Sequence, residues 1–218
     1  MKIGMLGTGV VGQTLGTKLI AVGHQVMLGS RQAGNEKATE WASRAGDGAS
    51  QGSLEDAARY GELVVNATAG GVSLDALNAA GAGNLAGKVL VDVANPLDAS
   101  KGFPPTLTIC NTDSLAETIQ RTFPDTFVVK TLNTVNADVM VDPAVAGGST
   151  TIFICGNDEQ AKATVAGLLQ SFGWAAGDIL DLGDIGAARG VEMYLPLWIR
   201  LWGAAGTGHL NVKVVVGS

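Results

Sequence analysis

Short apolar runs recur along the chain, and glycine, proline, asparagine or other turn residues bound each of them. Their length and their content of β-branched residues predict buried β-strands. The expected strands are residues 2–6, 25–28, 63–67, 88–93, 127–132, 150–155 and 178–182, with a more weakly patterned one at 211–216.

Segments with apolar residues at helical spacing separate these runs and predict helices at 13–22, 35–45, 54–60, 113–122, 158–172 and 185–202. Ser53 and Asp56 match a capping box at the start of the third helix, and Asn157 is the expected N-cap of the fifth. Pro196 should kink the last helix, because its ring removes a backbone hydrogen bond.

The alternation of strands and helices predicts an α/β fold with a doubly wound, mostly parallel sheet of the Rossmann type. The chain has 218 residues, which is enough for one large domain or one domain with a small appendage. Residues 151–218 are too few to bury a core comfortably on their own. We therefore expect this C-terminal extension to pack against residues 1–150.

The turn between the first strand and the first helix contains a Gly-x-Gly-x-x-Gly motif. In this position Gly7 allows a tight turn, Gly9 lets the backbone approach a pyrophosphate, and Gly12 lets the helix pack closely on the strand. The free N–H groups at the start of the helix favour a diphosphate. The motif predicts a dinucleotide-binding domain in residues 1–150, with cofactor contacts from Gly7, Thr8, Gly9, Val10, Val11 and Gly12.

The end of the second strand indicates which dinucleotide is bound. NAD sites carry an acidic residue about 20 residues after the glycine motif, but the first acid after Gly12 is Glu36. Ser30 and Arg31 stand there instead, and a hydroxyl beside a guanidinium suits a 2′-phosphate. We therefore expect NADP; the alternative is that Arg31 is an ordinary solvated residue.

Loops after three central strands should meet at the carboxyl edge of the sheet, where open parallel sheets bind their ligands. The small residues that leave room for the cofactor's ribose and diphosphate are Thr68, Ala69 and Gly70. Those suited to one face of a nicotinamide ring are Ala94, Asn95 and Pro96. Those that offer polar groups to a second planar ligand are Asn133, Thr134 and Asn136. Asparagine and threonine also favour turns, so each loop could instead merely end its strand.

Residues 193–202, in the last expected helix, are rich in large side chains. One interpretation is a helix that seals the core or forms the interface of a homodimer. The other is that Met193, Leu197 and Trp198 line the acceptor cleft, with Arg200 placed for a negatively charged tail.

The sequence offers no residue that stands out as a catalytic acid or base, and neither a Ser-His-Asp arrangement nor a Tyr-x-x-x-Lys helix is found. Lys130 lies in the middle of an expected strand and would need a partner, and His209 is expected to be a packing or pocket residue. Hydride transfer between two conjugated rings requires stacking in a dry cleft rather than a protein acid or base. We therefore predict such a transfer and no catalytic side chain.

Charge, cysteine and histidine content, and hydropathy limit which kinds of ligand and which cellular location we expect. The net charge is −6 and no basic run is present, which argues against nucleic-acid binding. Cys110 and Cys155 lack metal spacing and are expected to be buried free thiols in a reducing compartment, while His24 and His209 form no recognisable metal motif. The first strand begins at Lys2 and no long apolar run follows, so we expect neither a signal peptide nor a membrane span, and a cytoplasmic location.

Several motifs together resemble the NADPH-dependent coenzyme F-420 (deazaflavin) reductase family. They are the glycine turn, Gly29-Ser30-Arg31, Asn95-Pro96-Leu97, the Val-Lys-Thr-Leu-Asn run at 129–133 and Leu195-Pro196-Leu197. The resemblance covers nearly the whole chain. It implies an NADP-binding Rossmann domain at 1–150, with the acceptor held over the nicotinamide by residues 151–218. The chain is also similar to the NADPH domains of six-helix membrane metalloreductases, which pass electrons to flavin.

The expected activity is hydride transfer between NADP(H) and a flavin or deazaflavin acceptor. Two alternatives remain open from the residues alone. One is an NADP-dependent imine or carbonyl reductase of the pyrroline-carboxylate or hydroxyacid type, and the other is a non-catalytic NADP-sensing domain.

Overall fold

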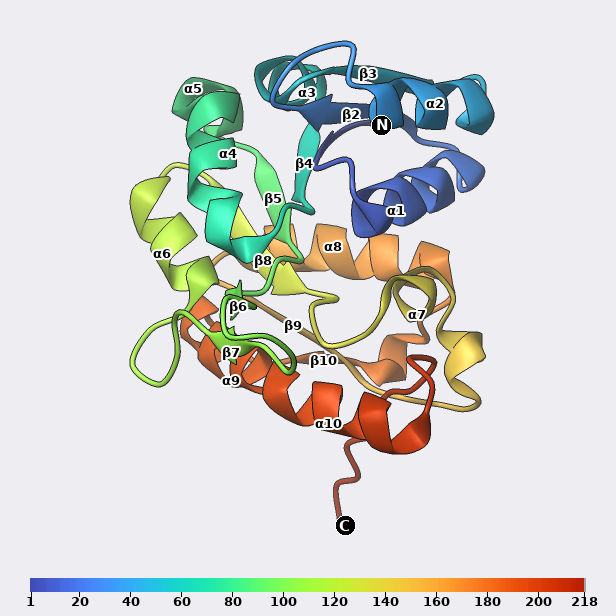
Figure 1. The fold of residues 1–218 in the computed structure, drawn as a ribbon, viewed down its shortest axis with the longest axis vertical. Helices are drawn as coiled ribbons and strands as arrows, with labels where there is room; N and C mark the ends of the chain where they lie inside the picture. The colour runs from blue at the N-terminus through green and yellow to red at the C-terminus, as the bar shows by residue number, and fades with distance from the viewer. Residues whose placement is uncertain (218) are drawn as a thin grey trace.

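Strand β1 (Lys2–Leu6) lies between β2 (Gln25–Ser30) and β4 (Leu63–Asn66) in a computed structural model that describes residues 1–217. The other strands of this sheet are β3 (Ala49–Ser53), β5 (Val89–Asp92), β8 (Phe127–Thr131), β9 (Ile152–Gly156) and β10 (Ile179–Asp181). Their order is β10-β9-β8-β5-β4-β1-β2-β3 (Figure 1). The chain therefore reverses its direction of winding between β1 and β4, and this switch point is where such sheets bind ligands.

Pairing is parallel throughout this sheet except between β8 and β9, which run antiparallel. A short antiparallel ribbon of β6 (Leu97–Asp98) and β7 (Thr106–Leu107) follows β5 at the carboxyl edge of the parallel strands. The expected α/β fold of the Rossmann type is confirmed.

Helices cover both faces of the sheet and enclose two hydrophobic cores (Figure 1). One face carries α1 (Val10–Ala21), α2 (Glu36–Ala45), α7 (Ala137–Val141) and α8 (Glu159–Phe172). The other carries α3 (Leu54–Tyr60), α4 (Ser73–Ala80), α5 (Ala82–Leu85), α6 (Leu115–Thr122) and α9 (Ala188–Met193). Side chains alternate along β1, so that Ile3 and Met5 enter the first core and Leu6 the second.

The last long helix, α10 (Leu195–Ala205), crosses the region of the β6–β7 ribbon and α7 (Figure 1). The Trp202 ring of α10 packs edge-on against the Phe103 ring, with the two centroids 5.8 Å apart. The helix therefore contacts the segment between β6 and β7. Beyond its end, His209 Nε2 lies 2.9 Å from Asp138 Oδ2 on α7. Of residues 151–217, two strands thus join the common sheet and one helix crosses its ligand edge.

Four local expectations are corrected by the structure. Residues 211–216 form no strand, because this tail only makes isolated bonds, such as Thr151 N–H to the Val212 carbonyl at 2.8 Å. β3 was not predicted because its sequence, Ala-Ser-Gln-Gly-Ser, has one small apolar residue and no β-branched or aromatic one; it forms by pairing in register with β2. The last helix is divided after Met193, and Pro196 occupies the first turn of α10, where its missing N–H costs nothing. Asp158 caps α8, whereas Asn157 accepts from the Ile185 N–H at 3.0 Å.

The two cysteines differ in exposure. Cys110 is exposed, so its expected burial is wrong: it lies in irregular chain after β7 rather than in a strand. Cys155 is buried in β9, and burial raises the pKa of its thiol to about 12. Within residues 1–217, no helix has the length and apolar character needed to span a bilayer.

Candidate active site

The glycine turn has the geometry that the motif predicts. Gly7 has a φ of +117°, which disfavours other L-residues, and a methyl group there would lie 2.6 Å from the Ala67 carbonyl oxygen. A methyl group on Gly12 would lie 2.2 Å from the Gly7 carbonyl oxygen, so α1 can approach the turn only because Gly12 has none. A methyl group on Gly9 would meet no atom within 4 Å beyond its chain neighbours. The turn is therefore closed on the protein side and open on the other.

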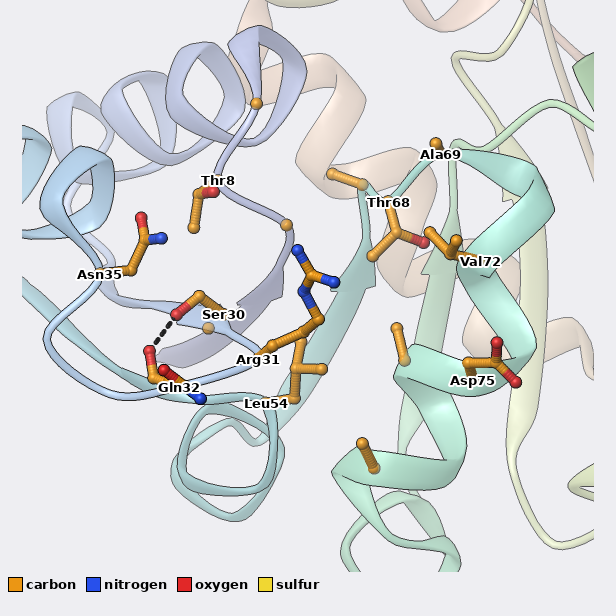
Figure 2. Close-up of a pocket in the computed structure, with 16 residues that line it drawn as sticks. Thr8, Ser30, Arg31, Gln32, Asn35, Leu54, Thr68, Ala69, Val72 and Asp75 are labelled. Carbon is orange, nitrogen blue, oxygen red and sulfur yellow. Dashed lines mark hydrogen bonds between the residues drawn. The ribbon is translucent and has the colours of Figure 1, made fainter. Parts of the chain in front are cut away.

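A cavity of about 820 Å³ opens beside this turn, between the ends of β1, β2 and β4 (Figure 2). The predicted cofactor residues that line it are Gly7, Thr8, Gly9, Ser30, Arg31, Thr68 and Ala69. Residues that the sequence did not suggest include Gln32, Asn35, Leu54, Val72 and Asp75. Such residues carry no motif of their own, and only the fold brings them to the cavity.

Arg31 projects its guanidinium into the cavity, between the glycine turn and Thr68 (Figure 2). In residues 1–217, no carboxylate lies within salt-bridge distance of this group. The neighbouring Ser30 donates its hydroxyl hydrogen bond to the Gln32 carbonyl, so to donate to a phosphate this hydroxyl would have to turn. Arg31 is thus a free cation directed at a cavity, which fits an anionic ligand better than a structural ion pair.

The residues present fit a nicotinamide dinucleotide phosphate. The N-cap of α1, Gly9, has no side-chain hydrogen bond and no acid occupies the first turn, so the N–H groups there are available to a diphosphate. Arg31 would provide the positive charge for a 2′-phosphate. When bound, this cofactor supplies a hydride at its nicotinamide ring. The remaining predicted cofactor contacts lie in three segments. The start of α1 holds Val10, Val11 and Gly12, the segment after β4 holds Gly70, and the loop after β5 holds Ala94, Asn95 and Pro96.

The loops after β4, β5 and β8 meet through close backbone contacts. A methyl group on Gly70 would lie 2.0 Å from the Asn95 carbonyl oxygen, so the first two loops touch. Asn95 and Asn133 exchange hydrogen bonds, from Asn95 Nδ2 to the Asn133 carbonyl at 2.9 Å and from Asn133 Nδ2 to Asn95 Oδ1 at 2.9 Å. Asn133 Nδ2 also donates to the Val191 carbonyl of α9 at 3.0 Å. These contacts join the proposed nicotinamide wall to the C-terminal helices.

Three buried polar atoms lack partners in the loop after β8 and around the start of α10. Within residues 1–217, the buried side-chain atoms that lack a hydrogen-bond partner are Thr134 Oγ1, the Tyr194 hydroxyl and Trp198 Nε1. Burying a polar group unpaired is costly, and such atoms are rare in folded proteins. Burial also raises the pKa of Tyr194, which keeps its phenol protonated. Thr134 and Trp198 were predicted as substrate contacts, whereas Tyr194 was not.

Large aromatic side chains extend this end of the site. The Trp198 and Trp202 rings stack with centroids 6.0 Å apart. Leu197 is 55% exposed and Met193 37% exposed, and Met193 Sδ accepts from the Asn111 N–H at 3.3 Å. Asn136, the remaining predicted substrate contact, uses its side chain to cap α7, accepting from the Val139 N–H at 3.0 Å.

Lys130 is fully buried beneath these loops, and it has the partners that its position requires. Its ammonium lies 2.8 Å from Asp92 Oδ2 and 3.0 Å from Glu192 Oε1, and it also donates to the Ala94 carbonyl. Burial alone would lower the pKa of Lys130, but the two carboxylates outweigh it and hold the pKa above its ordinary value. The lysine therefore remains charged. Asp92 and Glu192 were not singled out from the sequence, because nothing local marks a carboxylate as the partner of a distant lysine.

A switch-point cavity beside a glycine turn is typical of oxidoreductases that use a nicotinamide dinucleotide. Residues 2–96 match the family profile described as NADP oxidoreductase coenzyme F420-dependent. The chain is 31% identical over 225 residues to the F420-dependent NADP reductase of Methanocaldococcus jannaschii, covering 95% of this chain and 96% of that protein. It therefore belongs to the family of coenzyme F420-dependent NADP oxidoreductases and is an NADP-dependent enzyme.

Other relatives agree with this assignment. The crystal structure of a candidate F420-dependent NADP reductase from Arthrobacter sp. FB24 matches with a TM-score of 0.94 and 52% identity, covering 99% of this chain and 100% of that one. Metalloreductase STEAP3 of Rattus norvegicus is 30% identical over 203 residues. The chain spans 90% of its own length in that match but 38% of the metalloreductase.

More distant structures share the fold alone. A reductive aminase from Aspergillus terreus matches with a TM-score of 0.67 and 19% identity, covering 94% of this chain and 62% of that one.

Proposed function

We propose that this enzyme transfers hydride between NADP(H) and a flavin or deazaflavin ring. The observation that carries the proposal is the set of three unpartnered buried polar atoms, on Thr134, Tyr194 and Trp198. Thr134 follows Asn133, whose hydrogen bonds to Asn95 and Val191 connect the proposed nicotinamide loop to the C-terminal helices. A planar ring with polar edge atoms could satisfy all three. The stacked indoles of Trp198 and Trp202 supply an apolar surface of suitable shape. A relative over the full length is an F420-dependent NADP reductase, which agrees with a ring acceptor.

Binding and orientation are the roles that the residues would take. The start of α1 and Arg31 would hold the diphosphate and the 2′-phosphate, and Asn95 with Pro96 would hold the nicotinamide against the carboxyl edge. Thr134, Tyr194 and Trp198 would orient the acceptor ring and exclude water from the transfer. The acceptor gains one hydride from the cofactor and one proton from solvent, so the protein need not supply an acid.

Anaerobic stopped-flow mixing with NADPH tests the proposal, using coenzyme F420, FMN, FAD and riboflavin in turn. We expect fast NADPH oxidation with at least one of these rings and slow oxidation without it. Tight NADPH binding with no turnover on any ring would instead indicate a sensing domain.

A second candidate, an imine or carbonyl reductase, is favoured by one specific observation. The Tyr194 phenol is buried, unpartnered and kept protonated, so it could donate a proton to a small substrate as hydride arrives. Turnover on cyclic imines or 2-oxo acids that is abolished by Tyr194→Phe would support this candidate. Turnover on ring acceptors that survives the same substitution would support the first.

The exposed apolar side chains of α10, Leu197 and Trp202, are where a homodimer interface would lie. Sedimentation velocity tests the dimer directly. A monomeric mass at micromolar concentration would contradict it. The cytoplasmic location remains a prediction from the sequence.

A further inference from the structure

A buried ion cluster lies directly beneath the proposed nicotinamide loop. It consists of Lys130 on β8, Asp92 on β5 and Glu192 on α9, each at most 1% exposed. The lysine ammonium has three N–H donors, and Asp92, Glu192 and the Ala94 carbonyl accept all of them. The cluster therefore joins two strands of the sheet to the C-terminal helices through one side chain.

Stability alone does not explain this cluster. Buried ion pairs lose much of their mutual attraction to desolvation, and apolar residues of the same volume often do as well or better. A strand position flanked by Val129 and Thr131 could accept such a residue. What an apolar side chain could not do is hold the Ala94 carbonyl and the Glu192 carboxylate in one place.

Each partner of Lys130 leads to a different part of the site. Asp92 Oδ1 accepts a hydrogen bond from Asn66 Nδ2 at 2.8 Å. Asn66 Oδ1 in turn accepts one from the Thr68 hydroxyl at 2.7 Å, and Thr68 lines the cofactor cavity. The Ala94 carbonyl immediately precedes Asn95, the proposed nicotinamide contact.

Glu192 leads toward the acceptor end. Its carboxylate accepts from the Leu115 N–H at 2.8 Å and the Ala116 N–H at 3.1 Å, at the start of α6. Tyr194 follows two residues later and is the N-cap residue immediately before α10.

We propose that Lys130 is a positioning residue: it fixes the Ala94–Asn95–Pro96 loop against the nicotinamide and the start of α10 against the same loop. This inference rests on the proposed function for its kinetic effects but not for its effect on cofactor binding. Removing the ammonium should loosen the nicotinamide end of the cofactor site and leave the adenosine end unchanged. The reacting atoms of cofactor and acceptor would then lose their alignment.

The matched variants are Lys130→Met and Lys162→Met. Lys162 is also buried, and its ammonium lies 2.9 Å from Glu159 and 2.8 Å from Asp181. It sits near the ends of β9 and β10, strands that run opposite to β8, and so lies away from the ligand edge. Both substitutions remove a buried ammonium from two carboxylates, so both should lower the melting temperature. The carboxylates that pair with Lys162 are solvent-exposed, so Lys162→Met should lower it less.

Calorimetry separates a positioning role from a structural one. For Lys130→Met we expect NADPH affinity to fall about tenfold, whereas the affinity for 2′,5′-ADP, which lacks the nicotinamide, stays within about twofold of the parent. Lys162→Met should change neither affinity. With an active acceptor, kcat of Lys130→Met should fall about 100-fold, because small misalignments are costly in hydride transfer.

An unchanged ratio of NADPH to 2′,5′-ADP affinity in Lys130→Met would overturn the proposal, whatever happens to stability. If that variant does not fold, Glu192→Gln keeps an acceptor oxygen but removes the charge. Glu192→Gln should raise the acceptor KM by a larger factor than it lowers the affinity for NADPH. An unchanged acceptor KM in this variant would overturn the proposal. If no acceptor reacts with the parent enzyme, the proposed function fails, but the binding ratio still decides the role of Lys130.

Discussion

The two ends of the ligand edge are built in opposite ways. At the nucleotide end, two short local motifs face the cavity: the glycine turn between β1 and α1, and the end of β2, from which Arg31 points into the open cavity (Figure 2). At the acceptor end, contacts between distant segments form it, such as Asn95 with Asn133 and Asn133 with Val191. We expect the first end to recognise phosphate through the charge of Arg31 and the free N–H groups at the start of α1. The second presents buried, unpartnered polar atoms in an aromatic setting, which suits an uncharged ring.

The largest expected effect comes from a substitution in the glycine turn of the nucleotide end. Gly12→Ala places a methyl group 2.2 Å from the Gly7 carbonyl oxygen, so α1 must shift and NADPH binding should be lost at the highest concentration tested. Gly9→Ala meets only open space, so its melting temperature should match the parent while NADPH affinity falls. Calorimetry and thermal unfolding of both variants check the contrast. Full NADPH affinity in Gly9→Ala would show that the diphosphate does not approach this turn.

The second prediction tests the charge at the same end. Arg31→Ala should weaken NADPH by about 10- to 150-fold, the loss of roughly 1.5–3 kcal/mol expected for a charge-assisted hydrogen bond. NADH should be unaffected. Lys37→Ala, on the exposed first turn of α2, is the matched control and should change neither affinity. Equal losses for NADPH and NADH in Arg31→Ala would mean that Arg31 does not recognise the 2′-phosphate.

The third prediction addresses the acceptor end. Tyr194→Phe removes a buried hydroxyl that has no partner, so the melting temperature should stay the same or rise slightly. The acceptor KM should nevertheless rise about 3- to 10-fold, as expected for one lost neutral hydrogen bond of about 1 kcal/mol. NADPH affinity serves as the control. A lower melting temperature with an unchanged KM would mean that Tyr194 is a packing residue.

The smallest effect concerns an ion pair between α6 and α9. Arg189 on α9 donates two hydrogen bonds to Glu117 on α6, at 2.8 and 2.6 Å, and this contact lowers the pKa of Glu117 below its ordinary 4.5. A lowered carboxylate pKa means that the pair stabilises the fold above the ordinary pKa and that this contribution disappears as pH falls through the folded value.

Because Arg189 is partly exposed, the pair should contribute about 1 kcal/mol or less. Glu117→Gln should therefore lower the melting temperature slightly at pH 7, with the gap to the parent closing toward pH 3. A gap that stays constant over this range would exclude the ion pair as its cause.

Sequence reasoning succeeded where structure is local. The glycine turn, Ser30 with Arg31, the capping box at Ser53 and most strands depend on neighbours in sequence, and their patterns predict them directly. It failed where partners are distant. β3 exists only by pairing with β2, and Tyr194 became a candidate only once its hydroxyl proved to be buried without a partner. Lys130 lies between these two cases. Its need for a charged partner could be predicted from the sequence, but which residues are the partners, Asp92 and Glu192, could not.

The reversal of direction at β9 has a practical consequence. Because β9 and β10 run against β8, their carboxyl ends emerge on the side opposite to the cofactor mouth. The turn at 182–184, where Leu182 is well exposed, is therefore a suitable attachment point for a fluorophore or a solid support. An enzyme immobilised through this turn would keep its cofactor cavity facing the solution.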